Sequence, residues 1–195
     1  FMAYFNDIPF FIVLGRPRSG TTLMKTLLDA HPNIMIPHET QVYNIYHNYK
    51  RKKNWTPEVL KQFVSVIEKY SLLRYSVNFE KLTEDLSGLP SYNFSTVYKA
   101  LILQYPTIFD KEELLALGDK NPAYSLNIPT LIKLFPEAKF IHITRDYRDN
   151  IHSMQKIKAE TTWVTPLAFR WNYFQRKIEK SKRAHPDKFF SYRHE

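Results

Sequence analysis

The sequence contains no cysteine among its 195 residues. This absence excludes disulfide bonds, zinc sites built on cysteine thiolates, and a thiol nucleophile. Long apolar runs are also missing, since runs such as Phe10–Leu14 fall far short of the ~20 residues that span a bilayer. The first residues lack a signal-peptide pattern, because Asp7 and Pro9 interrupt them and no basic segment comes first. From these absences we expect no stable membrane insertion. The lack of cysteine favours a cytoplasmic protein over one of an oxidising compartment, and a targeting segment outside this sequence stays open.

Positive charge and aromatic residues are abundant instead. The chain has 28 Lys and Arg against 19 Asp and Glu, a formal net charge of +9. A balance this basic points to an anionic partner: nucleic acid, an anionic membrane, or a ligand that carries phosphate or sulfate. With 44% hydrophobic and 15% aromatic residues, the chain can form an ordinary core. We expect a single domain over residues 1–195.

Segments with strand and helix patterns alternate along the chain. Phe10–Leu14 is continuously apolar, which is typical of a buried strand in a parallel sheet. We predict strands at 10–14, 34–36, 139–144 and 189–192, and helices over 21–30, 57–70, most of 75–117, 125–135, 147–158 and 165–184. Asp119–Pro122 is predicted to be a loop. The alternation predicts an α/β fold with a mainly parallel sheet flanked by helices.

The most informative segment is Gly15–Thr22, which lies between a predicted strand and a predicted helix, as a phosphate-binding loop does. Its two glycines let backbone N–H groups approach an anion, and the helix N-terminus adds partial positive charge. Nucleoside triphosphatases place a lysine after the last glycine. Here Thr21 follows Gly20, and the cation is Arg18. The loop therefore suits an anion other than a magnesium-bound triphosphate; the alternative is an ordinary glycine turn with a solvated Arg18.

Pro17–Leu23 resembles the 5′-phosphosulfate loop of sulfotransferases that use 3′-phosphoadenosine 5′-phosphosulfate (PAPS). The longer stretch through Pro32 is similar to the tyrosylprotein sulfotransferases and their bacterial relatives. The resemblance covers residues 10–42 and 118–155 well and the middle of the chain poorly. It implies a P-loop-type fold, PAPS as co-substrate, 3′-phosphoadenosine 5′-phosphate (PAP) as product, and no metal. The residues that it implies for the 5′-phosphosulfate are Arg18, Ser19, Gly20, Thr21 and Thr22.

A second anion site is indicated by Arg145 at the end of a predicted strand. Ser153 comes eight residues later, roughly two helical turns into the next helix. An arginine at the carboxyl end of a strand and a helical hydroxyl can together hold a phosphate. In the family that the chain resembles, an Arg with a Ser eight residues on binds the 3′-phosphate, which implies this role for Arg145 and Ser153. The alternative is a surface pair of Arg145 with Asp146; Arg148 and Asp149 are predicted to be surface charges.

Sulfuryl transfer to a hydroxyl needs a base for its proton and cations where negative charge develops. In the tyrosylprotein-type enzymes a glutamate at the place of Glu39 is the base, whereas the cytosolic small-molecule branch uses a histidine, which makes His38 the rival. By the same resemblance, Lys120 and Arg18 stabilise charge at the bridging oxygen. The alternatives are a helix-capping Glu39 and a solvated turn lysine. Asn121 replaces an acid of the tyrosylprotein-type enzymes.

The sequence thus predicts a PAPS-dependent sulfotransferase that transfers a sulfuryl group to an acceptor hydroxyl or amine by in-line displacement. The sequence does not identify the acceptor, which is a small molecule, carbohydrate, lipid or peptide, and it leaves the oligomeric state open. No nucleic-acid partner is expected. Two alternatives remain: a P-loop kinase-like enzyme with a degenerate lysine, and a non-catalytic polyanion-binding domain that uses Lys50–Lys53, a run that otherwise is a solvated helix end. Because members of the family continue beyond the last predicted strand, we expect C-terminal elements of the fold to be lacking.

Overall fold

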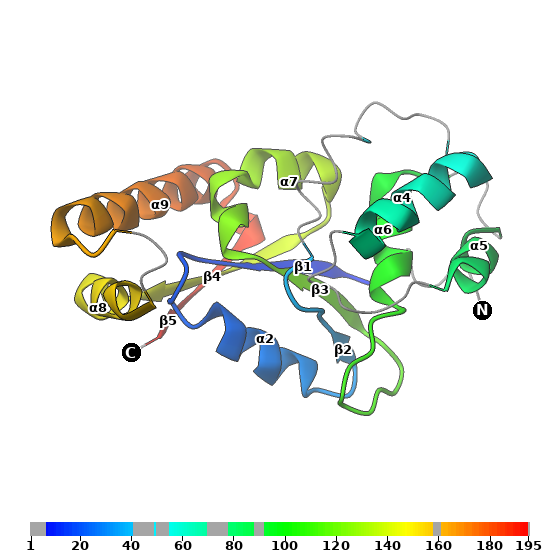
Figure 1. Cartoon of the computed structure of the whole chain (residues 1–195), viewed down its shortest axis with the longest axis horizontal. Coiled ribbons are helices and arrows are strands. Elements are labelled where there is room, and N and C mark those ends of the chain that lie inside the picture. The colour runs from blue at the N-terminus through cyan, green and yellow to red at the C-terminus, as the bar shows by residue number, and fades with distance from the viewer. Residues whose placement is uncertain are drawn as a thin grey trace. The chain divides into compact units, whose positions relative to one another are not determined.

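The computed structural model describes residues 7–40, 49, 55–69, 78–87, 92–157 and 161–194. The chain divides into two compact units, residues 1–10 with 28–119 and residues 11–27 with 120–195. The elements in chain order are β1 (Phe10–Leu14), α2 (Thr21–Asp29), β2 (Ile34–Met35), α4 (Pro57–Lys69), α5 (Phe79–Ser87), α6 (Phe94–Ile102), β3 (Ala116–Lys120), η1 (Pro122–Leu126), α7 (Ile128–Leu134), β4 (Lys139–Arg145), α8 (Tyr147–Ile157), α9 (Val164–Ala184), η2 (Pro186–Lys188) and β5 (Phe189–His194) (Figure 1). The basic run Lys50–Lys53 lies outside the described residues.

The strands form one five-stranded sheet in the order β2-β3-β1-β4-β5. β2 pairs in parallel with β3, β1 with β4, and β4 with β5. This arrangement confirms the predicted α/β fold with a mainly parallel sheet and helices around it. Parallel strands end at the same edge of a sheet, and ligands of such folds bind outside that edge. In the second unit this edge carries the ends of β1, β4 and β5.

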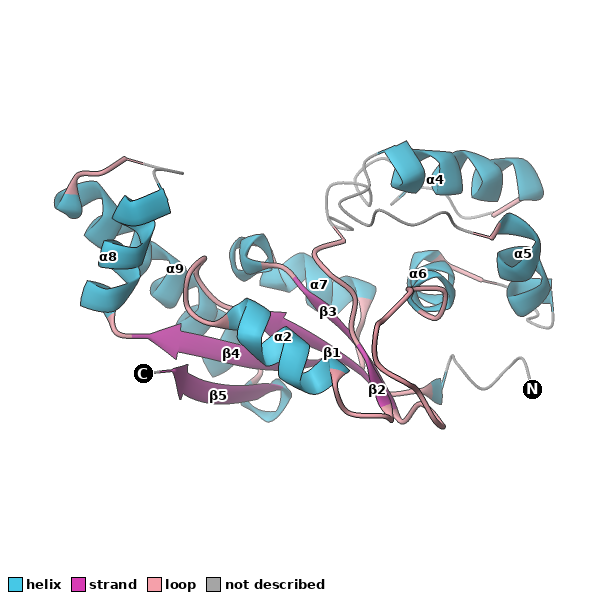
Figure 2. Cartoon of the chain, turned by 60° about the horizontal axis from the view of Figure 1, so that its bottom comes forward, coloured by secondary structure: helices cyan, strands magenta, loops and turns pink. Residues whose placement is uncertain are grey.

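Helices cover both faces of the strands in the second unit. α2 lies on one face, whereas α7 and α9 lie on the other (Figures 1 and 2). Residues Ile12–Leu14 of β1 are completely buried, as expected for a parallel strand covered on both faces. α8 starts directly after β4 and packs against α9 through Ile151, Met154 and Leu167. The predicted positions of β1, α2, β4, α8 and α9 are confirmed to within two residues.

The first unit has an aromatic core. The rings of Trp55 and Phe63 meet edge to face with centroids 5.1 Å apart, and Phe63 meets Phe94 in the same way at 5.7 Å. Phe94 in turn stacks on Tyr98, whose hydroxyl donates a hydrogen bond of 2.8 Å to the Asp119 carboxylate on β3. Aromatic packing on this scale contributes large buried apolar area. It connects α4 and α6 to the carboxyl end of β3.

Residues 75–117 differ from the prediction, which was largely helical. The helices α5 and α6 are present, but the described part of this stretch then runs without a helix into β3, whose last residues are Asp119 and Lys120. The predicted loop over these two residues is therefore wrong. β3 lacks the β-branched residues that mark strands. Its charged residue Asp119 can be buried because the carboxylate accepts hydrogen bonds from Thr40 and Tyr98, which lie far away in the sequence. Such distant partners leave no local pattern.

The predicted helix over 125–135 is split in two. η1 ends at Leu126, and α7 begins at Ile128 with Pro129 in its first turn. A proline has no backbone N–H and its ring collides with the carbonyl four residues earlier, so a single helix cannot run through this position.

His142 on β4 is almost completely buried, and its Nε2 lies 3.0 Å from the Thr144 hydroxyl. Desolvation by burial lowers the pKa of His142 from 6.5 to about 4. On α9, the charge of Glu179 acts in the opposite direction and that of Lys182 adds to the lowering. The unfolded chain therefore takes up this proton at a higher pH than the folded one. The stabilisation is complete above the unfolded pKa of 6.5 and is lost as the pH falls towards 4.

We expect the free energy of unfolding to fall by about 2 kcal/mol from pH 7 to pH 5, because the unfolded chain binds a proton at His142 that the folded chain does not. Urea titrations across this range measure the effect. His142→Asn should flatten the slope, whereas His152→Asn, at an exposed site on α8, should keep the wild-type slope. An unchanged slope in His142→Asn would contradict the assignment.

Candidate functional site

The segment Gly15–Gly20 connects β1 to α2, as predicted, and is called the anion loop here. It turns through two residues with positive φ, Arg18 at 68° and Gly20 at 93°. The Ser19 N–H donates to the Arg16 carbonyl over 3.2 Å and closes the turn. The first turn of α2 has no acidic residue, so its partial positive charge is not offset there. This loop geometry, followed by a helix N-terminus, is suited to an anion.

Glycine is required at position 20 for two reasons. A positive φ is unfavourable for residues with a side chain. In addition, a Cβ at this position would lie 2.9 Å from Cδ2 of His194, at the end of β5. The last residue of β5 therefore approaches the anion loop closely.

The structure brings the two predicted anion sites together. Nε of Arg18 donates a 3.0 Å hydrogen bond to the Ser153 hydroxyl on α8. Nη1 of Arg145, at the end of β4, lies 3.4 Å from the Arg18 carbonyl oxygen. A pocket of about 180 Å³ opens there, lined by Arg18, Gly20, Thr21, Thr22, Arg145 and His194. Residues predicted for both phosphate groups thus line one pocket, whereas Ser19 and Ser153, also predicted, are not part of its lining.

The charge of this pocket is positive. Its lining contains two guanidinium groups and no carboxylate. The nearest acidic residue in the sequence, Asp146, is engaged by Arg148 at 2.9 Å, and hydrogen bonds from Arg148 lower the pKa of Asp146 to about 2. The buried Nε of Arg145 finds no acceptor among the described residues. These features call for an anionic ligand that supplies oxygen acceptors.

Lys120 also reaches the start of α2. Its side chain is buried, and Nζ donates to the Thr22 hydroxyl over 3.2 Å. The predicted proximity of Lys120 to the 5′-phosphosulfate residues is therefore present, although Lys120 closes a strand. Arg148 and Asp149 are exposed, as predicted for surface charges.

Glu39 and His38 belong to the first unit and follow β2. Glu39 is half-buried, whereas His38 is exposed and its ring meets Tyr105 edge to face at 6.2 Å. The next residue, Thr40, is buried and donates a 3.0 Å hydrogen bond to Asp119. The choice between Glu39 and His38 as base stays a prediction.

Among the residues at the anion loop that sequence reasoning missed are one on α8 and one at the end of β5. Asn150 on α8 binds the loop through its side chain, and His194 lines the pocket. His194 could have been found, because β5 was predicted as a parallel strand and its end must lie at the ligand-binding edge. Asn150 has no such signal, since its partners are more than 130 residues away.

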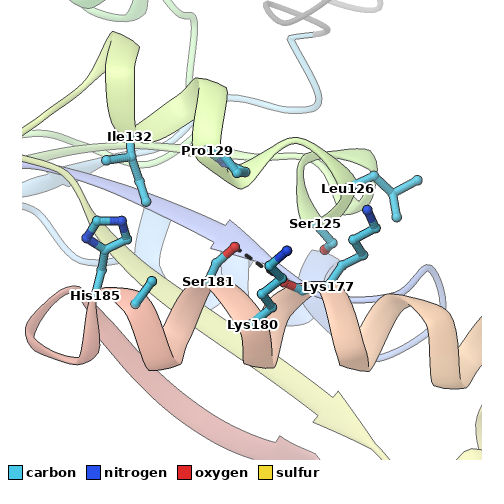
Figure 3. A pocket seen from close by; sticks show the side chains of 9 residues that line it. Ser125, Leu126, Pro129, Ile132, Lys177, Lys180, Ser181 and His185 are labelled. Carbon is cyan, nitrogen blue, oxygen red and sulfur yellow. Dashed lines mark hydrogen bonds between the residues drawn. The ribbon is translucent and has the colours of Figure 1, made fainter.

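A second hollow of the same unit lies between α9 on one side and η1 with α7 on the other (Figure 3). The hydroxyl of Ser125 in its wall accepts from the Gly15 N–H at 3.0 Å, and Ser181 donates to the Lys177 carbonyl at 3.3 Å. Both hydroxyls are therefore engaged in hydrogen bonds within the protein. Through Ser125, η1 holds the first residue of the anion loop.

Among the described residues, no helix has the length and apolar character needed to cross a bilayer. The same residues contain no group of three or more His, Asp or Glu side chains that could hold a metal ion.

Arg18 combines an unfavourable backbone conformation with a functional charge, and two substitutions separate these properties. Arg18→Ala removes the guanidinium and keeps the strain, whereas Arg18→Gly removes both. We expect Arg18→Gly to be more stable than Arg18→Ala by about 1 kcal/mol in chemical denaturation. Both should lose a similar part of the thermal stabilisation by inorganic phosphate. Equal stability of the two variants would contradict the positive φ of residue 18.

Comparison with known proteins agrees with this geometry. A family model described as "Sulfotransferase family" matches residues 9–195. Protein-tyrosine sulfotransferase 1 of Homo sapiens is 32% identical over 184 residues, which cover 93% of this chain and 42% of the relative. The chain thus spans less than half the length of this curated relative.

Two bacterial structures share the fold. The sulfotransferase domain from the Synechococcus PCC 7002 olefin synthase superposes with a TM-score of 0.61 at 20% identity, over 95% of this chain and 66% of that one. Sulfotransferase STF1 from Mycobacterium tuberculosis H37Rv gives 0.50 at 18% identity, over 95% and 62%. Because the family model matches nearly the whole of this chain, and the anion loop and Arg145 line one pocket, the chain belongs to the sulfotransferase family.

Proposed function

We propose that the protein is a PAPS-dependent sulfotransferase that transfers a sulfuryl group to an acceptor hydroxyl by in-line displacement. The observation that carries this proposal is the joining of the two anion sites: Arg18 contacts Ser153 through its side chain and Arg145 through its carbonyl oxygen. A single ligand with two anionic groups could therefore contact residues of both predicted sites. Family membership implies a sulfate donor, and PAPS is the donor that carries two such groups.

The residues divide between the two ends of this ligand. Backbone N–H groups of Gly20, Thr21 and Thr22, with the N-terminus of α2, bind the 5′-phosphosulfate. Ser19, which was also predicted for this group, is engaged within the protein, because its N–H donates to the Arg16 carbonyl and its hydroxyl contacts Asn150. Arg145 and Ser153 bind the 3′-phosphate, and the buried Nε of Arg145 gains an acceptor there. A bound bisphosphate also neutralises two guanidinium groups that share the pocket.

PAPS supplies an activated sulfuryl group, and the protein supplies the base and the cations. Glu39 accepts the proton of the acceptor hydroxyl as its oxygen forms a bond to sulfur. The bond between sulfur and the 5′-phosphate oxygen breaks in the same step, and negative charge develops on that oxygen. Lys120, buried beside Thr22, and Arg18 stabilise this charge. The proton ends on Glu39, and PAP leaves as the second product.

A peptide tyrosine is the first acceptor to test. The support is the printed name of the relative, a protein-tyrosine sulfotransferase, at 32% identity. Small phenols, carbohydrates and lipids with a free hydroxyl form the comparison panel. Incorporation of labelled sulfuryl groups from PAPS ranks these acceptors directly.

Calorimetric titration tests the binding sites. Arg145→Ala should weaken PAP binding about 100-fold, because it removes charge-assisted hydrogen bonds to the 3′-phosphate. Its affinity for adenosine 5′-phosphate, which lacks that group, should change less than threefold. Ser153→Ala should show the same pattern with a smaller loss.

Unchanged PAP affinity in Arg145→Ala would refute the assignment of the 3′-phosphate. Preference of the wild-type protein for ATP with Mg²⁺ over PAP would refute the donor and favour a kinase-like enzyme. A steep salt dependence without preference among these nucleotides would instead indicate a general polyanion-binding domain.

Turnover tests the base. Glu39→Ala should lower kcat at least 100-fold, because the acceptor proton loses its base, while PAP affinity stays within threefold of wild type. His38→Ala is the matched control and should retain most activity. The reverse result, with activity lost in His38→Ala and kept in Glu39→Ala, would assign the base to His38.

A further inference from the structure

The side chain of Asn150 on α8 binds three residues of the anion loop. Its amide Nδ2 donates to the Pro17 carbonyl at 2.8 Å and lies 3.2 Å from the Ser19 hydroxyl. Its Oδ1 accepts from Nε of Arg16 at 2.9 Å. Both polar atoms of the amide are therefore engaged with the loop, and none of the Asn150 side chain is exposed.

Arg16 makes this contact unusual. Its side chain is fully buried, and its guanidinium lies over the Phe174 ring of α9, 5.6 Å from the ring centroid. A buried cation is costly unless hydrogen bonds and aromatic contacts hold it. Such a residue has one well-defined position, so the bond from Arg16 fixes the Asn150 amide. The amide in turn fixes the loop carbonyl of Pro17.

Asn150 also has a defined relation to the second anion site. It lies five residues after Arg145 and three residues before Ser153, on the helix that carries Ser153. One helical turn of α8 therefore both binds the anion loop and presents the hydroxyl of the second site. Because the helix is rigid, a displacement of Asn150 also displaces Ser153.

We propose that Asn150, held by Arg16, is a positioning residue that sets the distance between the two anion sites. This proposal rests on the proposed function, in which one bisphosphate occupies both sites. A ligand that bridges two sites gains affinity over its separate halves only when the spacing is held at the bound value. Loosening the contact between α8 and the loop costs the bridging ligand more than a ligand that uses one site.

The test compares three probes in Asn150→Ala: PAP, adenosine 5′-phosphate and adenosine 3′-phosphate, each titrated by calorimetry into the full-length protein. We expect PAP affinity to fall about tenfold and that of each monophosphate less than threefold. In turnover, KM for PAPS should rise while KM for the acceptor stays unchanged.

Two further variants separate positioning from folding. Asn150→Asp keeps an acceptor for Arg16 and the side-chain shape but loses the donor to the Pro17 carbonyl, so it should fold and still lose PAP affinity selectively. His152→Ala on the exposed side of α8 is the matched control and should bind all three probes as wild type does.

The outcomes are distinct. An equal loss for all three probes would show that Asn150 maintains only the loop and would overturn the proposal, as would unchanged binding in both Asn150 variants. If the wild-type protein itself fails to bind PAP more tightly than adenosine 5′-phosphate, the proposed function fails instead. Selective loss of PAP in both variants supports the positioning role.

Discussion

A loop that turns its backbone N–H groups towards a single point must pass through conformations that most residues avoid. In this chain, Arg18 and Gly20 adopt positive φ. Three residues of the second unit hold this conformation. Ser125 binds the beginning of the loop, Asn150 binds its middle, and His194 lies against its end. Each comes from a different element, so the conformation depends on the assembled unit rather than on the loop sequence alone.

The same elements explain why the site lies where it does. β1, β4 and β5 are parallel, so their ends share one edge, and Arg145 and His194 are the last residues of their strands. α2 begins at that edge after the loop, and α8 begins there after β4. The pocket is positively charged because its lining contains Arg18 and Arg145 and no carboxylate.

The parts predictable from sequence were those encoded by neighbouring residues. The run Phe10–Leu14 followed by a glycine-bearing loop located β1 and the loop after it. Arg145 was correctly placed at the end of a strand and Ser153 on the helix that follows, whereas their role in binding a phosphate stays a prediction. β3 was missed, because its strand conformation depends on β2 and on buried partners of Asp119 far along the chain. The contacts of Asn150 with the anion loop could not be predicted either, because no local pattern around a helical asparagine indicates a partner 134 residues away.

The crowding of two guanidinium groups in one hollow also bears on how the protein will behave in solution. Like charges without a lining counter-charge repel each other, and any small oxyanion that enters relieves this repulsion. Because such an anion binds the folded chain and not the unfolded one, its concentration adds to stability by mass action. Sulfate or phosphate in the buffer will therefore bind there as well, raising the melting temperature and competing with any larger anionic ligand for the same pocket.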